Sequence, residues 1–203
     1  MNTVLALVIA YMLGSISFGY LAGKVVKGID IRQHGSGNAG STNIQRTLGM
    51  VPAIVVLLLD IAKGLFAVLV AKALTGSEPV QMFAGIAAVA GHNWPLFFKF
   101  RGGRGIATTM GVFIGLAPQV ILIATIIGVS VIAITRYVSL GSIIGVLTIP
   151  IFMLIFKMPA YYVLFGALMA VIAVWRHRQN ITRLLKGTEN KLGAKVKTKN
   201  EEK

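Results

Sequence analysis

The sequence predicts an all-α integral membrane protein with seven transmembrane helices, an N-terminus outside the cell and a C-terminus in the cytoplasm. Its 203 residues are 56% hydrophobic and only 13% charged, whereas soluble domains are about 25% charged. Long apolar runs recur along the chain, and the basic residues fall almost entirely between them. Because cytoplasmic loops of membrane proteins collect Lys and Arg, the net charge of +14 indicates a membrane surface, and we expect no nucleic-acid partner.

Six apolar stretches approach or exceed the length that crosses a hydrocarbon core of about 30 Å. They are 2–23, 51–73, 80–98, 106–135, 140–156 and 160–175. The first stretch lacks the basic segment that precedes the apolar part of a secretory signal, so we interpret it as a retained span. Cysteine is absent, which excludes a disulfide framework and a thiolate nucleophile.

The stretch 106–135 determines the topology. It is too long for one untilted span, and Pro118 in its middle breaks a helix. As one span, it would place the basic segments on either side of it on opposite faces of the membrane. As a hairpin that turns at 117–118, it places all four basic segments on one face, as the positive-inside rule favours. We therefore expect the hairpin, although its first half, 105–116, is short for a span.

Residues 1–192 are expected to form a single polytopic membrane domain. Residues 193–203 are polar and charged, and we expect them to be a disordered tail.

The first basic loop, DIRQHGSGNAGSTNIQR over 30–46, combines three glycines with neutral hydrogen-bond donors. Glycine-rich turns present successive backbone N–H groups to an anion, and Arg46 adds a planar guanidinium suited to phosphate. The loop leads into a helix expected to start at Thr42 or Asn43, and a helix N-terminus also favours anions. The alternative is a flexible polar loop with a helix cap. No Walker A string is present, so nothing indicates ATP.

The second segment, GHNWPLFFKFRGGRGIATT over 91–109, has the same chemistry. Its RGGRG turn opens a helix with Thr108 in the first turn, so guanidinium groups, exposed backbone and a helix N-terminus occur together. His92 lies near the end of a span, where an interfacial hydrogen-bonded histidine and a site residue are equally good interpretations.

Two further segments carry polar residues at helical spacing. In RYVSLGS, Ser139 and Ser142 have the spacing of helix caps. In the segment 175–191, His177, Asn180 and Arg183 recur every three residues, so they lie near one helix face and can converge on a ligand. The alternative is a basic helix lying on anionic headgroups.

Asp60 and Lys63 lie inside an apolar run, where charges are costly and are paired or functional. Their three-residue spacing permits an ion pair on one helix face. We interpret them as a structural brace that reaches toward the site, and less favourably as a proton relay.

Together, the strings GSGNAGSTNIQR, GHNWPLFFKFRGGRGIAT, RYVSLGS and RHRQNITRLLKGTE resemble the signature blocks of the bacterial acyl-phosphate:glycerol-3-phosphate acyltransferases, the PlsY family. The resemblance runs from LGSISFGY in the first span to GTE near the tail. It implies a seven-helix enzyme of the bacterial inner (plasma) membrane with its active site on the cytoplasmic side. The reaction it implies transfers a fatty acyl group from acyl phosphate to the 1-hydroxyl of glycerol 3-phosphate, giving lysophosphatidic acid and phosphate, without a metal or organic cofactor. We expect a monomer in contact with membrane lipids.

The resemblance and the chemistry of the blocks assign residues to three roles. The catalytic residues are Ser36, Arg46, Arg104, His177 and Asn180. The substrate-binding residues are Gly37, Asn38, Thr42, Asn43, His92, Arg101, Gly102, Gly103, Thr108, Ser139, Ser142 and Arg183. The structural residues are Asp60, Lys63 and Glu189. One departure concerns Arg104, where the family more often has Lys, and the two are not equivalent phosphate binders.

The sequence contains no G-x-S-x-G string and no H-x-x-x-x-D string of the common glycerolipid acyltransferases. Phosphate is a good leaving group, so we expect direct attack of the hydroxyl without an acyl-enzyme, with a phosphate oxygen of the donor taking the proton. The alternatives are a transporter or channel for a phosphorylated or anionic solute, and a lipid-binding scaffold. Basic loops on one face and the absence of a visible inverted repeat argue against a transporter.

Overall fold

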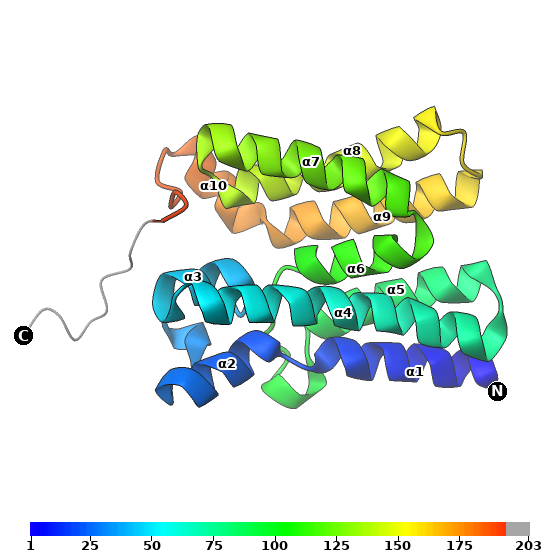
Figure 1. The fold of residues 1–203 in the computed structure, drawn as a ribbon, viewed down its shortest axis with the longest axis horizontal. Coiled ribbons are helices and arrows are strands. Elements are labelled where there is room, and N and C mark those ends of the chain that lie inside the picture. Colours follow the sequence, from blue (N-terminus) through cyan, green and yellow to red (C-terminus); the bar gives the residue numbers. More distant parts are fainter. Residues whose placement is uncertain (194–203) are drawn as a thin grey trace, which may run out of the picture. The chain divides into compact units, whose positions relative to one another are not determined.

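The computed structural model describes residues 1–193, and these form helices and connecting loops without a β-strand, which confirms the predicted all-α class. They divide into two compact units, Met1–Val112 and Phe113–Leu192, with the boundary inside one helix. Figure 1 shows the elements of each unit. The tail predicted at 193–203 lies outside the described residues, except for Gly193.

The first unit contains five complete α-helices, two short 3₁₀ turns and the start of a sixth α-helix. They are α1 (Asn2–Ser15), α2 (Phe18–Lys27), η1 (Ile31–Gln33), α3 (Ser41–Leu48), α4 (Met50–Thr75), α5 (Glu78–Asn93), η2 (Leu96–Phe98) and α6 (Ile106–Leu116).

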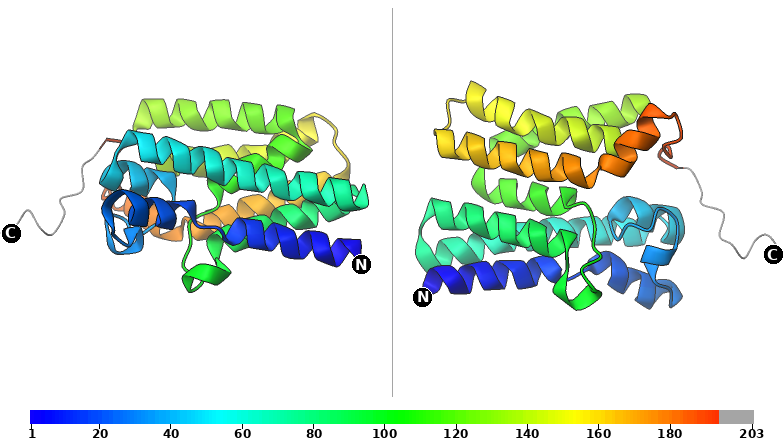
Figure 2. Two further views of the ribbon diagram at one scale, coloured as in Figure 1. Left: turned by 60° about the horizontal axis from the view of Figure 1, so that its bottom comes forward. Right: turned by 180° about the vertical axis from the view of Figure 1, so that it is seen from behind.

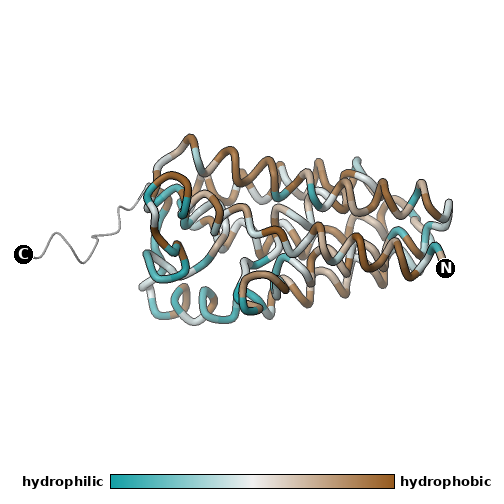
Figure 3. The backbone as a smooth tube through the Cα atoms, turned by 90° about the horizontal axis from the view of Figure 1, so that it is seen from below, coloured by the Kyte–Doolittle hydropathy of each residue, from teal (hydrophilic) through white to brown (hydrophobic). Residues whose placement is uncertain are grey.

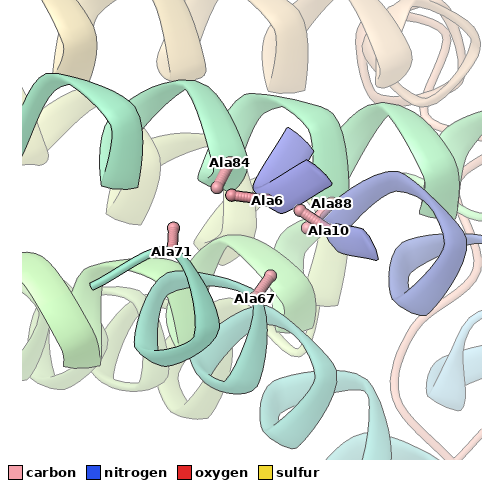
Figure 4. Packing of buried hydrophobic residues seen from close by; sticks show 6 residues of the cluster. All are labelled: Ala6, Ala10, Ala67, Ala71, Ala84 and Ala88. Atoms are coloured by element: carbon pink, nitrogen blue, oxygen red, sulfur yellow. The ribbon is translucent and has the colours of Figure 1, made fainter. Parts of the chain in front are cut away.

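Helix α1 packs against α4 and α5, and it runs beside α5 in Figure 2. Small side chains line this contact, as Figure 4 shows for the buried residues Ala6, Ala10, Ala67, Ala71, Ala84 and Ala88. A Cβ added to Gly14 would overlap the backbone of Ala88, so the two helices approach as closely as glycine permits. Close packing of small residues is how helices associate where lipid supplies no hydrophobic drive between them.

The apolar stretch predicted at 2–23 has the length of a span but is not a single helix. It breaks at Ile16 and Ser17, between α1 and α2, with Ile16 in an extended conformation. The Nζ of Lys63 on α4 donates a hydrogen bond of 2.8 Å to the carbonyl oxygen of Ile16. A contact from a distant part of the sequence therefore stabilises the break.

The second unit contains the end of α6 and four further helices, α7 (Pro118–Thr135), α8 (Val138–Ile155), α9 (Ala160–Arg176) and α10 (Arg178–Leu185). Helix α8 packs between α7 and α9. The chain breaks at Ala117 with Pro118 as the first residue of α7, and in Figure 1 it turns back there. This confirms the predicted break at 117–118. Between α9 and α10 the chain bends by 60°.

Within residues 1–193, length and composition identify four segments that can cross a membrane, or five if the bent pair α9 and α10 is one span. Figure 3 shows hydrophobic residues along the long helices and hydrophilic residues in the turns and short helices. Large apolar side chains such as Leu58, Phe66 and Leu164 are exposed, which is the pattern of a lipid-facing surface. The chain is therefore a multi-pass membrane protein.

Candidate active site

The first basic loop begins with a tight turn held by one ion pair. The Asp30 carboxylate accepts hydrogen bonds from the backbone N–H and the guanidinium of Arg32, and the ion pair measures 2.8 Å. These hydrogen bonds from Arg32 hold the pKa of Asp30 below its usual value. Arg32 also donates to the carbonyl oxygen of Phe98 at 2.6 Å. Arg32, which is not among the predicted site residues, thus ties this loop to the segment after α5.

Asn43 organises the rest of the loop. Its buried side chain donates to the carbonyl oxygens of Ile31 (3.3 Å) and His34 (3.0 Å) and accepts from the backbone N–H of Ser36 (2.9 Å). Gly35 contacts the Asn43 side chain with φ of +61°, and a Cβ there would overlap it. Since the Asn43 amide is engaged by the backbone, its observed role is to shape the loop.

The shaped loop leaves the other predicted residues at its surface. Ser36 and Gly37 are exposed, and Asn38, Thr42 and Arg46 are half-buried. Helix α3 starts at Ser41, one residue earlier than predicted, and Arg46 lies in its last turn. An exposed glycine turn, a hydroxyl and a guanidinium therefore occur within one short segment, which is the composition of an anion site.

The second basic segment folds onto the end of α5. The backbone N–H of Gly103 donates to the carbonyl oxygen of His92 at 3.1 Å, and that of Gly102 donates to Asn93 at 3.3 Å. A Cβ at Gly102 would overlap the His92 carbonyl, and a Cβ at Gly103 would overlap the His92 ring. The glycines therefore allow the turn to rest directly on His92.

The cationic side chains of this turn remain accessible. Arg101 is exposed and Arg104 is half-buried. Helix α6 starts at Ile106, which places the buried Thr108 in its first turn, as predicted.

Asp60 and Lys63 form the predicted ion pair at 2.8 Å, and both side chains are buried. The Nδ1 of His92 lies 3.5 Å from the same carboxylate oxygen of Asp60. The brace thus extends from α4 to His92 on α5.

In the second unit, Glu189 gathers three of the predicted residues. Its carboxylate accepts hydrogen bonds from Ser139 Oγ (2.8 Å), Asn180 Nδ2 (2.7 Å) and Arg183 Nε (2.6 Å). Burial by itself would raise the pKa of Glu189, but the hydrogen bonds from Asn180, Arg183 and Ser139 hold it below its usual value. Asn180 Oδ1 is buried and has no hydrogen-bond partner within the described chain, so it remains an acceptor for a ligand.

His177 is buried at the bend between α9 and α10. Its Nδ1 lies 2.7 Å from the carbonyl oxygen of Ala173. A carbonyl only accepts hydrogen bonds, so Nδ1 carries the proton and, in the neutral ring, Nε2 is the acceptor nitrogen. Ser142 is half-buried on α8.

Two expectations for this unit were wrong. Ser139 does not cap a helix, because the N-cap of α8 is Tyr137 and the Ser139 hydroxyl donates to Glu189. His177 does not share one straight helix with Asn180 and Arg183, because the chain bends at His177. Asn180 and Arg183 do lie on one side of α10, where both reach Glu189.

Within residues 1–193, no group of three or more His, Asp and Glu side chains is arranged to hold a metal ion.

The comparisons agree on one family. A family model described as glycerol-3-phosphate acyltransferase matches residues 4–187. The glycerol-3-phosphate acyltransferase of Halalkalibacterium halodurans is 50% identical over 195 residues, covering 93% of this chain and 95% of that protein. The glycerol-3-phosphate acyltransferase of Desulforamulus reducens is 46% identical over 194 residues, covering 96% of this chain and 97% of that protein.

Two crystal structures of PlsY, an integral membrane glycerol 3-phosphate acyltransferase, share the fold. Its glycerol 3-phosphate form has a TM-score of 0.90 and 37% identity, covering 95% of this chain and 96% of that chain. Its lysophosphatidic acid form has a TM-score of 0.88 and 36% identity, with the same coverage. The chain therefore belongs to the glycerol-3-phosphate acyltransferase family of integral membrane proteins.

Proposed function

We propose that this enzyme transfers a fatty acyl group from acyl phosphate to the 1-hydroxyl of glycerol 3-phosphate, giving lysophosphatidic acid and inorganic phosphate. The observation that carries the proposal is the chain-long likeness to a protein whose glycerol 3-phosphate and lysophosphatidic acid forms are known. These two molecules are the acceptor and the product of the proposed reaction.

The choice of donor is supported by the chemistry of the chain. The chain has no cysteine, and neither a G-x-S-x-G nor an H-x-x-x-x-D string is present. An enzyme without such a nucleophile or base suits a donor that is already activated, and acyl phosphate leaves as phosphate. Both substrates carry phosphate, which suits the two exposed basic segments around Arg46 and Arg104.

In the proposed reaction, the glycerol hydroxyl oxygen attacks the acyl carbonyl carbon and the bond from that carbon to the phosphate oxygen breaks. The hydroxyl proton passes to a phosphate oxygen of the donor, so no covalent acyl-enzyme forms. Positioning and electrostatic stabilisation then supply the rate enhancement. Trapping of a labelled acyl group on the protein during turnover would contradict this step.

The residues divide by chemistry in this proposal. Arg46, Arg101 and Arg104 bind phosphate oxygens, together with the backbone N–H groups of the glycine turns and Ser36. His177 Nε2 accepts a hydrogen bond from the non-reacting 2-hydroxyl of glycerol 3-phosphate and so orients the acceptor, while the proton of the attacking 1-hydroxyl goes to the donor phosphate. Asn180, fixed by Glu189 through its Nδ2, offers its Oδ1 to a substrate donor.

The proposal places the protein in the bacterial inner membrane with seven spans and the active site on the cytoplasmic side. It includes α5 and α6 as spans, although they have only 16 and 11 residues. The positive-inside rule supports this orientation, because it places all four basic segments on the cytoplasmic face.

The test uses purified protein in detergent with a fatty acyl phosphate and glycerol 3-phosphate. We expect phosphate release that requires both substrates, and lysophosphatidic acid detected by mass spectrometry. The same protein with acyl-CoA in place of acyl phosphate is expected to be inactive. Equal rates with acyl-CoA would contradict the donor assignment, and phosphate release without the acceptor would contradict acyl transfer.

Arg46→Ala and His177→Ala are each expected to reduce kcat/KM at least about 100-fold, because Arg46 binds a substrate phosphate and His177 orients the acceptor for attack. Both variants should remain membrane-inserted, as judged by yield and gel-filtration profile in detergent. Wild-type activity in both variants would overturn the site assignment.

A transporter for an anionic solute is the alternative, and the same preparation distinguishes it. Protein reconstituted in liposomes would then take up labelled glycerol 3-phosphate but release no phosphate from acyl phosphate.

A further inference from the structure

We propose that Asp60 and Lys63 are positioning residues, which act through His92 to hold the basic turn 101–105 in its binding conformation. The inference rests on the proposed function for the identity of the ligand of that turn, a substrate phosphate. It goes beyond a structural brace, because it predicts an effect on one substrate and not on the fold alone.

Asp60, Lys63 and His92 form a buried cluster. Asp60 is 2% exposed, Lys63 is 4% exposed and His92 is 7% exposed. Burying an ion pair costs desolvation energy, and apolar residues of similar volume often stabilise a fold equally well or better. Stability alone is therefore a weak reason for the pair, and its contacts indicate what else it does.

The Asp60 carboxylate lies beside the His92 ring. The Asp60 oxygen that pairs with Lys63 at 2.8 Å also lies 3.5 Å from His92 Nδ1. A carboxylate on this side of the imidazole orients the ring and favours the proton on Nδ1. The other ring nitrogen, Nε2, then faces the Gly103 side of the turn, where a Cβ would overlap it.

The basic turn 101–105 packs on His92. The N–H of Gly103 donates to the His92 carbonyl oxygen, and the absence of a Cβ at Gly103 lets the turn lie directly against the His92 ring. A rotation of the ring would therefore displace Gly103, and Arg104 follows directly in the chain. The position of the Arg104 guanidinium thus depends on the orientation of His92.

The ion pair is also held on its other side, by the backbone after α1. Lys63 donates to the Ile16 carbonyl oxygen at 2.8 Å in the break after α1. Helix α1 also contacts the segment after α5, because the Tyr11 hydroxyl donates to the Trp94 carbonyl at 2.8 Å. The hydrogen bond between Tyr11 and Trp94 involves neither residue of the pair, so the contact between α1 and the segment after α5 has support that is independent of Asp60.

The experiment measures kcat and the KM of each substrate for the wild type, Arg104→Ala and Asp60→Asn. Arg104→Ala identifies the substrate whose phosphate contacts the turn. Asp60→Asn is expected to raise the KM of that same substrate at least about fivefold and to change the KM of the other less than about twofold. Lys72→Gln, at an exposed position of the same helix α4, is the matched control and should match the wild type.

A second variant separates positioning from bracing. Asp60→Asn combined with Lys63→Met removes the pair without leaving an unpaired buried charge. A brace predicts that this variant, once folded, has wild-type kinetics, whereas positioning predicts the same selective rise in KM. In a double-mutant cycle, Asp60→Asn should raise the KM of that substrate little further in the Arg104→Ala background, because no Arg104 guanidinium remains to be positioned.

The outcomes separate this inference from the proposed function. Wild-type protein without acyl transfer would overturn the function itself. If the wild type is active and the folded Asp60→Asn, Lys63→Met variant has unchanged KM values, only the positioning role is overturned. If neither Asp60 variant inserts, His92→Gln, which keeps the ion pair, must raise the same KM, and an unchanged KM would overturn the inference.

Discussion

At the residue scale, several predicted site residues are engaged by the protein and not displayed to solvent. Asn43 satisfies three backbone groups of the glycine loop, and Glu189 accepts from three side chains of its unit. Each is a buried polar group with well-matched partners, so it rigidifies the segment around it. The backbone of Ser36 and the side chain of Asn180 are thereby held in a fixed conformation.

Glu189→Gln is expected to lower the melting temperature in detergent by roughly 5 °C at pH 7, because an amide replaces a carboxylate that accepts from three donors. The pKa of Glu189 is lowered in the fold. Its contribution is therefore present above the ordinary glutamate pKa of about 4.3 and is lost as the pH falls through the folded value. The difference in melting temperature between the wild type and Glu189→Gln should accordingly narrow below about pH 4.

Differential scanning fluorimetry across this pH range measures the effect. Glu78→Gln is the control, since Glu78 is an exposed carboxylate in the first turn of α5 and should show a smaller shift at pH 7. A melting temperature of Glu189→Gln equal to wild type at pH 7 would show that the network does not stabilise the fold.

The local sequence could identify these residues but not their partners. Ser139 has the spacing of a helix cap, and its actual partner, Glu189, lies 50 positions away. Asn43 was predicted to bind substrate from its place in a glycine-rich loop, whereas its partners are backbone groups of that same loop. A pattern of residue types indicates available donors and acceptors, and only the fold determines which of them meet.

At the element scale, breaks in the helices were predictable when their cause was local. Pro118 removes a backbone donor, and the chain breaks beside it. The break at Ile16 has no proline, and Lys63 satisfies the exposed carbonyl there from another helix. Helix α5 ends at Asn93, two residues before Pro95, so this end has a local cause that the predicted span 80–98 passed over. Tyr11 and Arg32 from other elements then hold the turn that follows it.

Contacts between helices in the first unit depend on single glycines. A Cβ at Gly64 on α4 would overlap the carbonyl oxygen of Thr108 on α6, which is backbone and cannot move alone. Gly64→Ala is therefore expected to destabilise the protein by about 2 kcal/mol or more, as overpacking does. A Cβ added at Gly166 would lie 2.8 Å from Met153 Sδ, which belongs to a flexible side chain.

Gly166→Ala is accordingly the matched control and should cost less than about 1 kcal/mol, because the Met153 side chain can move aside. Thermal unfolding of both variants in one detergent gives the comparison. Equal melting temperatures for the two would show that α4 and α6 separate without cost.

At the scale of the whole molecule, the number of spans depends on α5 and α6, which have 16 and 11 residues. The positive-inside rule requires α6 to cross the membrane if all basic segments face the cytoplasm. Yet α6 has 11 residues and is about 16 Å long, half of the hydrocarbon thickness. Hydropathy alone therefore could not decide between a crossing helix and a re-entrant one, whereas it identified the longer spans directly.

Single cysteines can decide the topology, because the chain has none of its own. We expect a membrane-impermeant maleimide to label Glu78→Cys and Gln119→Cys from outside intact cells, and to label Lys186→Cys only after the membrane is opened. All three positions are exposed in the structure.

Gln119 is the decisive position, since it directly follows the break between α6 and α7. Labelling of Gln119→Cys only in opened membranes, with Glu78→Cys still labelled from outside, would mean that α6 does not cross and that seven spans is wrong. Labelling of Lys186→Cys in intact cells would instead reverse the proposed orientation of the C-terminal basic segment and place its His177 and Asn180 away from cytoplasmic glycerol 3-phosphate.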